Sequence, residues 1–317
     1  MERNLALELV RVTEAAALAS ARWMGKGDGD AADRAARDAI SVVMKSVKLS
    51  GRVIIGDTDV TVAAASGKPG SKTEIPDVDI AVDALQSIQS LAYGRPLAIA
   101  TIAVSNRGAF LVPPVPYMNK IAVGPEAAGR INLKASALDN LVNIADAKRC
   151  YVEDLTVCIL DRERHRSLID DVRAAGARIA LIPDGDLTAM LATALPASGV
   201  DVVMGIGGSA EGVLAAAALK CVGGDMQAQF HARDDADEKT LREGGFDKRD
   251  SVLRVDDIVR GESTMFAATG ITTSDVLLGV QFVPGGAVTH SIVMRSQSGT
   301  VRQITAHHRF DRKPVYT

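Results

Sequence analysis

The sequence predicts a two-domain protein in which an α+β half is followed by an α/β half. The chain has 317 residues, enough for a sizeable core and for two domains. Helical periodicity opens the chain at residues 5–24, whereas residues 155–221 alternate short apolar runs with amphipathic segments. That alternation is typical of a mainly parallel sheet with helices on its faces. We expect a first domain over residues 1–146 and a second over residues 147–317.

The first half mixes helices and strands without a regular order. The first helix has apolar residues at three- and four-residue steps and ends at Gly25 and Gly27. Asp30 is expected to cap a second helix that runs to about Ser46. Residues 61–76 are rich in Ala, Gly, Ser and Pro and predict a long irregular loop. The remaining predicted elements are strands over 52–55 and 78–82, a helix over 83–91, a hairpin of 97–104 with 108–112, and a helix over 138–147.

The second half is more regular. It predicts strands over 155–160, 178–182 and 200–204, each followed by a helix, over 165–175, 187–194 and 211–221. Residues 233–250 form a charged run, which we interpret as a solvated loop with a short helix rather than a binding surface. A hairpin of residues 291–295 and 301–307 closes the chain.

Composition excludes several classes of partner. The net charge is −3 and no block of five or more Lys or Arg residues occurs, so neither nucleic acid nor an anionic membrane is expected as a partner. No uninterrupted apolar stretch reaches about 18 residues, so we expect neither signal peptide nor membrane span. The three cysteines, Cys150, Cys158 and Cys221, are isolated and indicate a reduced, cytoplasmic protein.

Four carboxylates stand at predicted element junctions. Asp57 and Asp83 end strands, whereas Asp33 and Glu211 open helices. Such junctions are where folds of this class gather ligand groups, and hard oxygen donors from several segments suit Mg²⁺ or Mn²⁺. For Asp33 alone a cap or surface role is the better interpretation, but the four together favour a metal site.

The segments that carry these acids resemble the class II fructose-1,6-bisphosphatases of the lithium-sensitive, Mg²⁺-dependent phosphatase superfamily. The resemblance runs nearly end to end. It rests on short motifs in family order at residues 11–20, 22–28, 32–33, 54–56, 79–83, 117–120, 123–125, 182–186, 205–208, 211–212, 268–272 and 311–313. It implies the layered αβαβα sandwich of the sugar phosphatases and a homo-oligomer.

The resemblance also implies the site residues. The family's metal ligands, for Mg²⁺ or Mn²⁺, fall on Asp33, Asp57, Asp83, Gln86 and Glu211, with Asp33, Asp83 and Gln86 acting in catalysis. Its contacts with a phosphorylated sugar fall on Tyr117, Arg162, Arg164, Asp184, Gly185, Asp186 and Gly208. These types suit the task, because arginines fork onto phosphate, carboxylates accept from hydroxyls, and glycines let backbone N–H groups approach an anion.

The departures from the family concentrate in the catalytic half. Asp57 and Gln86 stand where the family has glutamate, so one methylene and one negative charge are missing. Ser87 replaces a glycine that shapes the phosphate turn, and Ile88 replaces a threonine that orients the attacking water. Gly29 and Asp30 replace a lysine and an asparagine, and the stretch over residues 60–66 is shortened; Asp59 or Asp30 could substitute for the lost acid.

Two functions remain open. The first is a divalent-metal phosphatase acting on a sugar phosphate such as fructose 1,6-bisphosphate, with sedoheptulose 1,7-bisphosphate as a further candidate. The alternative is a catalytically impaired or repurposed relative that binds a sugar phosphate in a regulatory or specialised biosynthetic role. A dinucleotide loop at residues 205–208 is disfavoured because the spacing is not GxGxxG. A Ser/His/Asp hydrolase is disfavoured because no GxSxG occurs.

Overall fold

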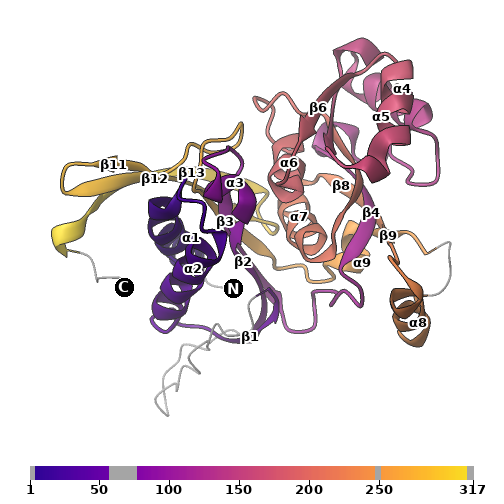
Figure 1. Ribbon diagram of the computed structural model, residues 1–317. Coiled ribbons are helices and arrows are strands. Elements are labelled where there is room, and N and C mark those ends of the chain that lie inside the picture. The colour runs from indigo at the N-terminus through magenta and orange to yellow at the C-terminus, as the bar shows by residue number, and fades with distance from the viewer. Residues whose placement is uncertain (1–3, 57–76, 247–250, 313–317) are drawn as a thin grey trace. The chain divides into compact units, whose positions relative to one another are not determined.

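The computed structural model describes residues 4–56, 77–246 and 251–312. Within it the chain divides into two compact units, one made of Met1–Phe110 with Gly261–Thr317 and the other of Leu111–Arg260 (Figure 1). Residues 57–76 lie outside the described part of the chain. They include the loop predicted over residues 61–76 and the candidate ligands Asp57 and Asp59. None of the described helices is long and apolar enough to cross a membrane.

The first unit is built on a seven-stranded mixed sheet. Its strands run in the order β1-β2-β3-β10-β12-β11, with β13 added to β12. They span Ser50–Ile55 (β1), Asp77–Gln86 (β2), Ile99–Asn106 (β3), Met265–Gly270 (β10), Gln281–Val283 (β11), Gly286–Arg295 (β12) and Thr300–Arg309 (β13). The hairpin expected near the C-terminus is confirmed as β12 and β13, which pair antiparallel.

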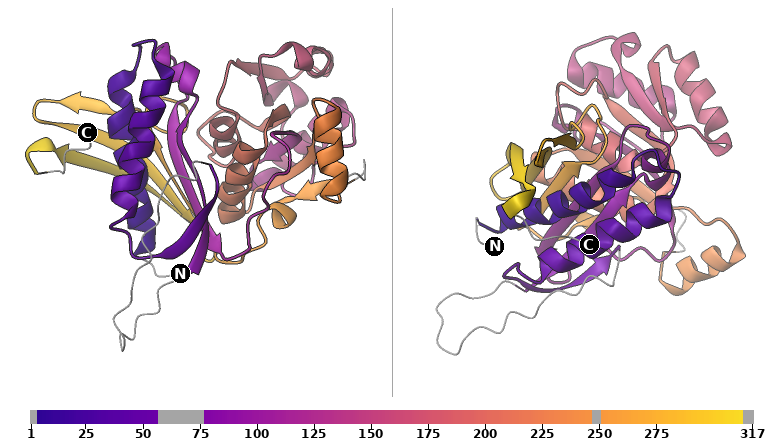
Figure 2. Two further views of the ribbon diagram at one scale, coloured as in Figure 1. Left: turned by 60° about the horizontal axis from the view of Figure 1, so that its bottom comes forward. Right: turned by 60° about the vertical axis from the view of Figure 1, so that its left-hand side comes forward.

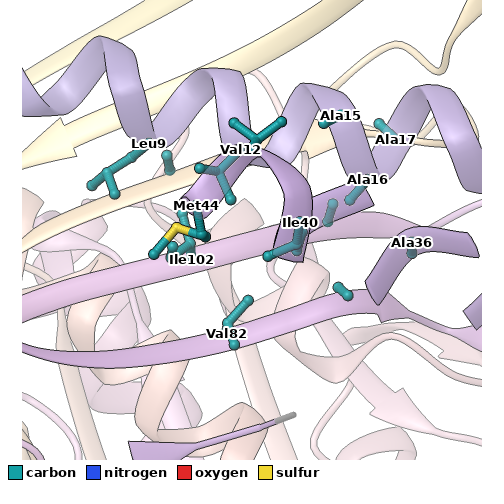
Figure 3. Close-up of a cluster of buried hydrophobic side chains, with 14 of the residues drawn as sticks. Leu9, Val12, Ala15, Ala16, Ala17, Ala36, Ile40, Met44, Val82 and Ile102 are labelled. Carbon is teal, nitrogen blue, oxygen red and sulfur yellow. The ribbon is translucent and has the colours of Figure 1, made fainter. Parts of the chain in front are cut away.

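Two helices cover this sheet. Helices α1 (Leu5–Ser20) and α2 (Gly29–Met44) lie side by side and pack on β2, β3, β10 and β12 (Figure 2). Their shared core contains Leu9, Val12, Ile40, Met44 and Ile102, all fully buried (Figure 3). Alanines fill the remaining inward positions, which lets the helices approach closely despite the scarcity of aromatic residues. A third, short helix, α3, spans Ile88–Ala92.

The second unit carries a six-stranded sheet in the order β6-β5-β7-β4-β8-β9. The strands span Tyr117–Val123 (β4), Thr156–Leu160 (β5), Arg178–Ile182 (β6), Val202–Gly208 (β7), Asp225–Phe230 (β8) and Leu253–Arg254 (β9). The helices span Ala137–Lys148 (α4), Arg166–Ala174 (α5), Asp186–Thr193 (α6), Ser209–Val222 (α7), Asp235–Glu243 (α8) and Val255–Ile258 (α9). The predicted β-α alternation is confirmed, and so is the layered α+β class. The sheet is mixed, because β4 pairs antiparallel with both β7 and β8.

The units differ from the expected division at residue 146. Strand β10 pairs with β3, and β12 pairs with β10, so the C-terminal segment belongs to the first unit. Strand β4 pairs with β7 and β8, so the residues from Leu111 onwards belong to the second. The pairings of β3 with β10 and of β4 with β8 join residues more than a hundred positions apart in sequence, so the local sequence pattern does not predict them.

Three local expectations were wrong. The helix expected from Asp83 is strand as far as Gln86, because Ala84, Leu85 and Gln86 are buried in the sheet; helix begins only at Ile88. The N-cap of α2 is Asp28 rather than Asp30, since the Asp28 side chain accepts from the Ala31 N–H. The turn expected at residues 106–108 forms, but residues 108–112 build no hairpin strand in the described structure, because β2 and β10 occupy the two edges of β3.

Candidate active site

The densest group of candidate residues lies in the second unit, where β7 ends and α7 begins. Tyr117 opens β4 directly opposite Gly208, the last residue of β7. A Cβ on Gly207 would collide with the Asp186 carboxylate, and one on Gly208 would collide with the Glu211 carboxylate. Glycine at these positions lets each carboxylate pack directly on the backbone of the strand end, and a larger residue would displace it.

A buried ion pair lies at the centre of this group. The Lys120 ammonium on β4 is 2% exposed and lies 2.7 Å from Asp186 Oδ2. It also donates to the Gly208 carbonyl at 2.8 Å. Asp186 opens α6 and follows Gly185, whose φ of 90° is a conformation that glycine adopts without strain. The ion pair therefore links the start of α6 to the strand end that precedes α7.

Two arginines flank the Tyr117 ring. The Arg164 guanidinium carbon lies 5.6 Å from the ring centroid and that of Arg233 lies 5.9 Å from it. Arg164 donates through Nε and Nη2 to the Ile206 carbonyl at 3.3 and 2.9 Å. Arg233 is oriented by Asp237 through contacts of 2.7 and 3.1 Å. Guanidinium groups on an aromatic face keep their donors in a fixed plane, which suits recognition of phosphate oxygens.

His165 ties the arginine loop to the strand end. Its Nε2 accepts from the Ile206 N–H at 2.8 Å, so its Nδ1 carries the proton and donates to the Leu160 carbonyl at 2.8 Å. The ring packs against Gly205, whose φ is 126°. Burial, followed by the charges of Arg164 and Arg162, lowers the pKa of His165 below its ordinary 6.5. The loop thus depends on a neutral histidine.

We expect acid to loosen this loop. A depressed pKa contributes stability that is present above about 6.5 and is lost as pH falls through the folded-state value. Protonation would place a second N–H against the Ile206 N–H. The melting midpoint of the wild type should therefore fall more between about pH 7.5 and pH 5.5 than that of His165→Gln, which has no ring to titrate. His307→Gln, at an exposed histidine of β13, is the control and should track the wild type. Equal slopes for all three proteins would contradict the assignment.

Two carboxylates in this group, Asp184 and Glu211, have pKa values above their ordinary range. The pKa of Asp184 is raised by burial first and by the charge of Asp186 second, although the Gly185 N–H and Arg162 oppose the shift. The pKa of Glu211 is raised by burial and by Asp186, with Lys120 opposing. Buried acids with raised pKa values are favoured where a cation or a hydroxyl-rich ligand completes their environment.

The remaining described metal-ligand candidates lie in the first unit, on two different elements, β2 and α2. Asp83 is half-buried on β2, and Gln86 is 4% exposed beyond a break in the pairing of β2 with β3. Asp33 lies in the first turns of α2, with its carboxylate 2.9 Å from Arg37. The structure thus places Asp83 and Gln86 on one strand end, and it does not describe Asp57.

Hard oxygen donors are the right kind of ligand for Mg²⁺ or Mn²⁺, and the carboxylates of Asp33 and Asp83 and the amide of Gln86 fit in chemistry. Within the described residues, however, no group of three or more His, Cys, Asp or Glu side chains is close enough to hold a metal ion. Asp33 would have to exchange its ion pair with Arg37 to serve as a ligand. Asp33, Asp83 and Gln86 therefore offer the type of oxygen ligand that Mg²⁺ or Mn²⁺ prefers, but only two of the three carry a negative charge.

The turn at Ser87 and Ile88 has its own packing. Ser87 adopts φ 64° and ψ 47°, the left-handed conformation that glycine adopts more easily, and its buried hydroxyl has no partner among the described residues. A Cβ on Gly29 would lie 2.6 Å from Ile88 Cγ2. Ile88 therefore packs on Gly29, and the two residues form one apolar contact.

Three residues at the site were not among the predicted site residues. Lys120 carries a detectable signal, because it is a charged residue in the apolar alternation of residues 118–122. His165 follows Arg164 directly and could have been noticed as a histidine at a strand–helix junction. Arg233 had no signal, since it lies within a charged run that we interpreted as solvated.

The α+β fold and the arginines at the glycine-lined strand end fit the class of sugar-phosphate phosphatases. The model of the family described as bacterial fructose-1,6-bisphosphatase, glpX-encoded, matches residues 3–308, and the chain belongs to this family. Proteins of the family are metal-dependent phosphatases.

Characterised relatives align along nearly their whole length. The chain is 38% identical over 327 residues to fructose-1,6-bisphosphatase 1 class 2 of Escherichia coli strain K12, covering 99% of this chain and 97% of the relative. It is 36% and 34% identical to the D-fructose 1,6-bisphosphatase class 2/sedoheptulose 1,7-bisphosphatases of Microcystis aeruginosa and Thermosynechococcus vestitus. Those two alignments cover 100% and 99% of this chain and 99% and 98% of the relatives. The resemblance inferred from the sequence motifs is confirmed.

Proposed function

We propose that this protein hydrolyses a phosphate monoester of a sugar bisphosphate, with fructose 1,6-bisphosphate as the first candidate and sedoheptulose 1,7-bisphosphate as the second. The observation that carries the proposal is the group in the second unit, where Arg164 stacks on Tyr117 and Asp186 is fixed at the glycine-lined strand end. The names of the relatives support the same two substrates.

The roles of the residues follow from their chemistry. Arg164, already oriented by Ile206 and Tyr117, presents guanidinium donors to a phosphate, and Arg162 in the same loop adds a second cation. Asp184 and Asp186 accept from sugar hydroxyls. Gly185 and Gly208 precede α6 and α7, and the backbone N–H groups at these helix starts would donate to an anionic ligand.

Metal ligation is part of the proposal. Asp33, Asp57, Asp83, Gln86 and Glu211 would hold Mg²⁺ or Mn²⁺, which when bound polarises the phosphoryl group and lowers the pKa of the attacking water. Because Gln86 is neutral, we propose weaker binding of fewer ions than in relatives with glutamate there. The protein is further proposed to be cytoplasmic and homo-oligomeric.

A second function is favoured by the Ser87–Ile88 turn. Ser87 is held in a left-handed conformation, and Ile88 packs on Gly29, at two positions where the resemblance implies polar side chains. These features would slow hydrolysis while leaving the second unit's ligand contacts intact. The alternative is therefore a protein that binds a sugar phosphate in a regulatory or specialised biosynthetic role.

The two functions separate in one experiment. Phosphate release from fructose 1,6-bisphosphate and from sedoheptulose 1,7-bisphosphate is measured with Mg²⁺ or Mn²⁺, and calorimetry measures binding of the same sugars. We expect release that depends on the metal, stops with a chelator and is lost in Asp83→Asn. Binding without release would favour the second function, and neither binding nor release would contradict both.

A further inference from the structure

We propose that Lys120 is a positioning residue for the sugar end of the substrate: its buried ammonium holds the Asp186 carboxylate and the Gly208 carbonyl in their ligand-binding arrangement. This inference rests on the proposed function, because Asp186 and Gly208 are the groups assigned there to sugar-phosphate contact. Lys120 itself is not assigned as a contact.

The ion pair engages one of the two oxygens of Asp186. Lys120 engages Oδ2 at 2.7 Å, and Asp186 is itself 8% exposed. A carboxylate paired through one oxygen keeps the acceptor positions of the other for a hydroxyl. The result is a fixed acceptor at the start of α6.

The same ammonium fixes the first peptide of α7. Lys120 donates to the Gly208 carbonyl at 2.8 Å, while the N–H of the same peptide, on Ser209, donates to the Pro116 carbonyl at 2.8 Å. The peptide is therefore held from both sides. Because Gly208 is the N-cap of α7, this peptide sets how the helix that carries Glu211 begins.

Stability alone does not account for this arrangement. Removing an ammonium from water is costly, and replacing a buried ion pair by apolar residues is often neutral or stabilising. The backbone also accommodates the pair. A Cβ on Gly207 would lie 2.1 Å from Asp186 Oδ2 and 3.0 Å from Lys120 Nζ, so the absence of a side chain there leaves space for both groups. In the described structure the Lys120 ammonium donates to Asp186 and to the Gly208 carbonyl, both ligand-site groups, and the orientation of those groups explains the pair.

The second unit offers a matched control. Lys148 on α4 also pairs with an aspartate at 2.7 Å, Asp201, and is 24% exposed in its side chain. None of its salt-bridge partners belongs to the ligand group. Lys148→Met therefore removes a lysine with an equally short aspartate pair, and with a second pair to Glu126, without touching Asp186 or Gly208.

The test compares two substrates. For fructose 1,6-bisphosphate, Lys120→Met should raise KM about 10- to 100-fold, with kcat within about threefold of wild type, because the lost interaction serves binding. For p-nitrophenyl phosphate, which has no sugar hydroxyls, both constants should stay within about threefold. Lys148→Met should match the wild type with both substrates. Asp186→Asn should reproduce the Lys120→Met effect, and the double variant should add little to it.

Each other outcome decides the question. An unchanged KM in a folded Lys120→Met, or an equal loss with both substrates, overturns the inference. If Lys120→Met does not fold, Lys120→Gln, which keeps a donor without the charge, is measured in the same way. If the wild type hydrolyses neither substrate, the proposed hydrolysis fails, and calorimetry with fructose 1,6-bisphosphate decides the role of Lys120. A wild type that binds, with a variant about 10-fold weaker or more, supports it; binding that Lys120→Met leaves unchanged, or a wild type that does not bind, overturns it.

Discussion

The double variant Gln86→Glu with Ile88→Thr is expected to hydrolyse fructose 1,6-bisphosphate about 10²- to 10⁴-fold faster than the wild type. Glutamate at position 86 adds a negative oxygen donor, and threonine at position 88 adds a hydroxyl that can orient water. Threonine keeps the γ-methyl that contacts Gly29, so the turn should retain its packing.

Single changes separate the two effects. Gln86→Glu alone should tighten Mg²⁺ and Mn²⁺ binding by calorimetry, whereas Ile88→Val, which keeps the branched shape without a hydroxyl, should leave turnover unchanged. Wild-type turnover on the order of 10 per second would show that these substitutions cost little. A slow wild type with no gain in the double variant would shift the cause to the segment that contains Asp57.

Arg164→Ala is expected to weaken binding of fructose 1,6-bisphosphate by about 10- to 150-fold, because a charge-assisted hydrogen bond contributes roughly 1.5–3 kcal/mol. The substitution removes both the guanidinium on Tyr117 and its hydrogen bonds to Ile206. Calorimetry without added metal measures the effect separately from turnover.

A neighbouring arginine provides the control for that experiment. Arg166 opens α5 and pairs with Glu163 at 3.2 Å, with both side chains largely exposed. Arg166→Ala should bind the sugar bisphosphate as the wild type does. Equal binding by wild type and Arg164→Ala would show that the ligand contacts of the second unit are wrongly assigned.

Much of the candidate site could be recognised in the sequence because its residues lie in short contiguous motifs. Arg162 and Arg164 share one loop, Asp184 to Asp186 another, and Gly207 and Gly208 directly precede α7. A junction between a strand and the following helix depends on neighbouring residues, so the spacing of glycines and charged residues predicts it. Lys120 and His165 were missed because their roles depend on partners more than 40 residues away, Asp186 and Ile206.

By itself the sequence determined the family, the layered α+β class, the β-α alternation of the second unit and the C-terminal hairpin. Each of these follows from local periodicity or from the order of the motifs. Only the tertiary structure decided that β10 joins β3, that residues 83–86 continue a strand, and that Ile88 packs on Gly29. Strand pairing and burial are set by contacts between distant segments, and these contacts override the local preference of any one of them.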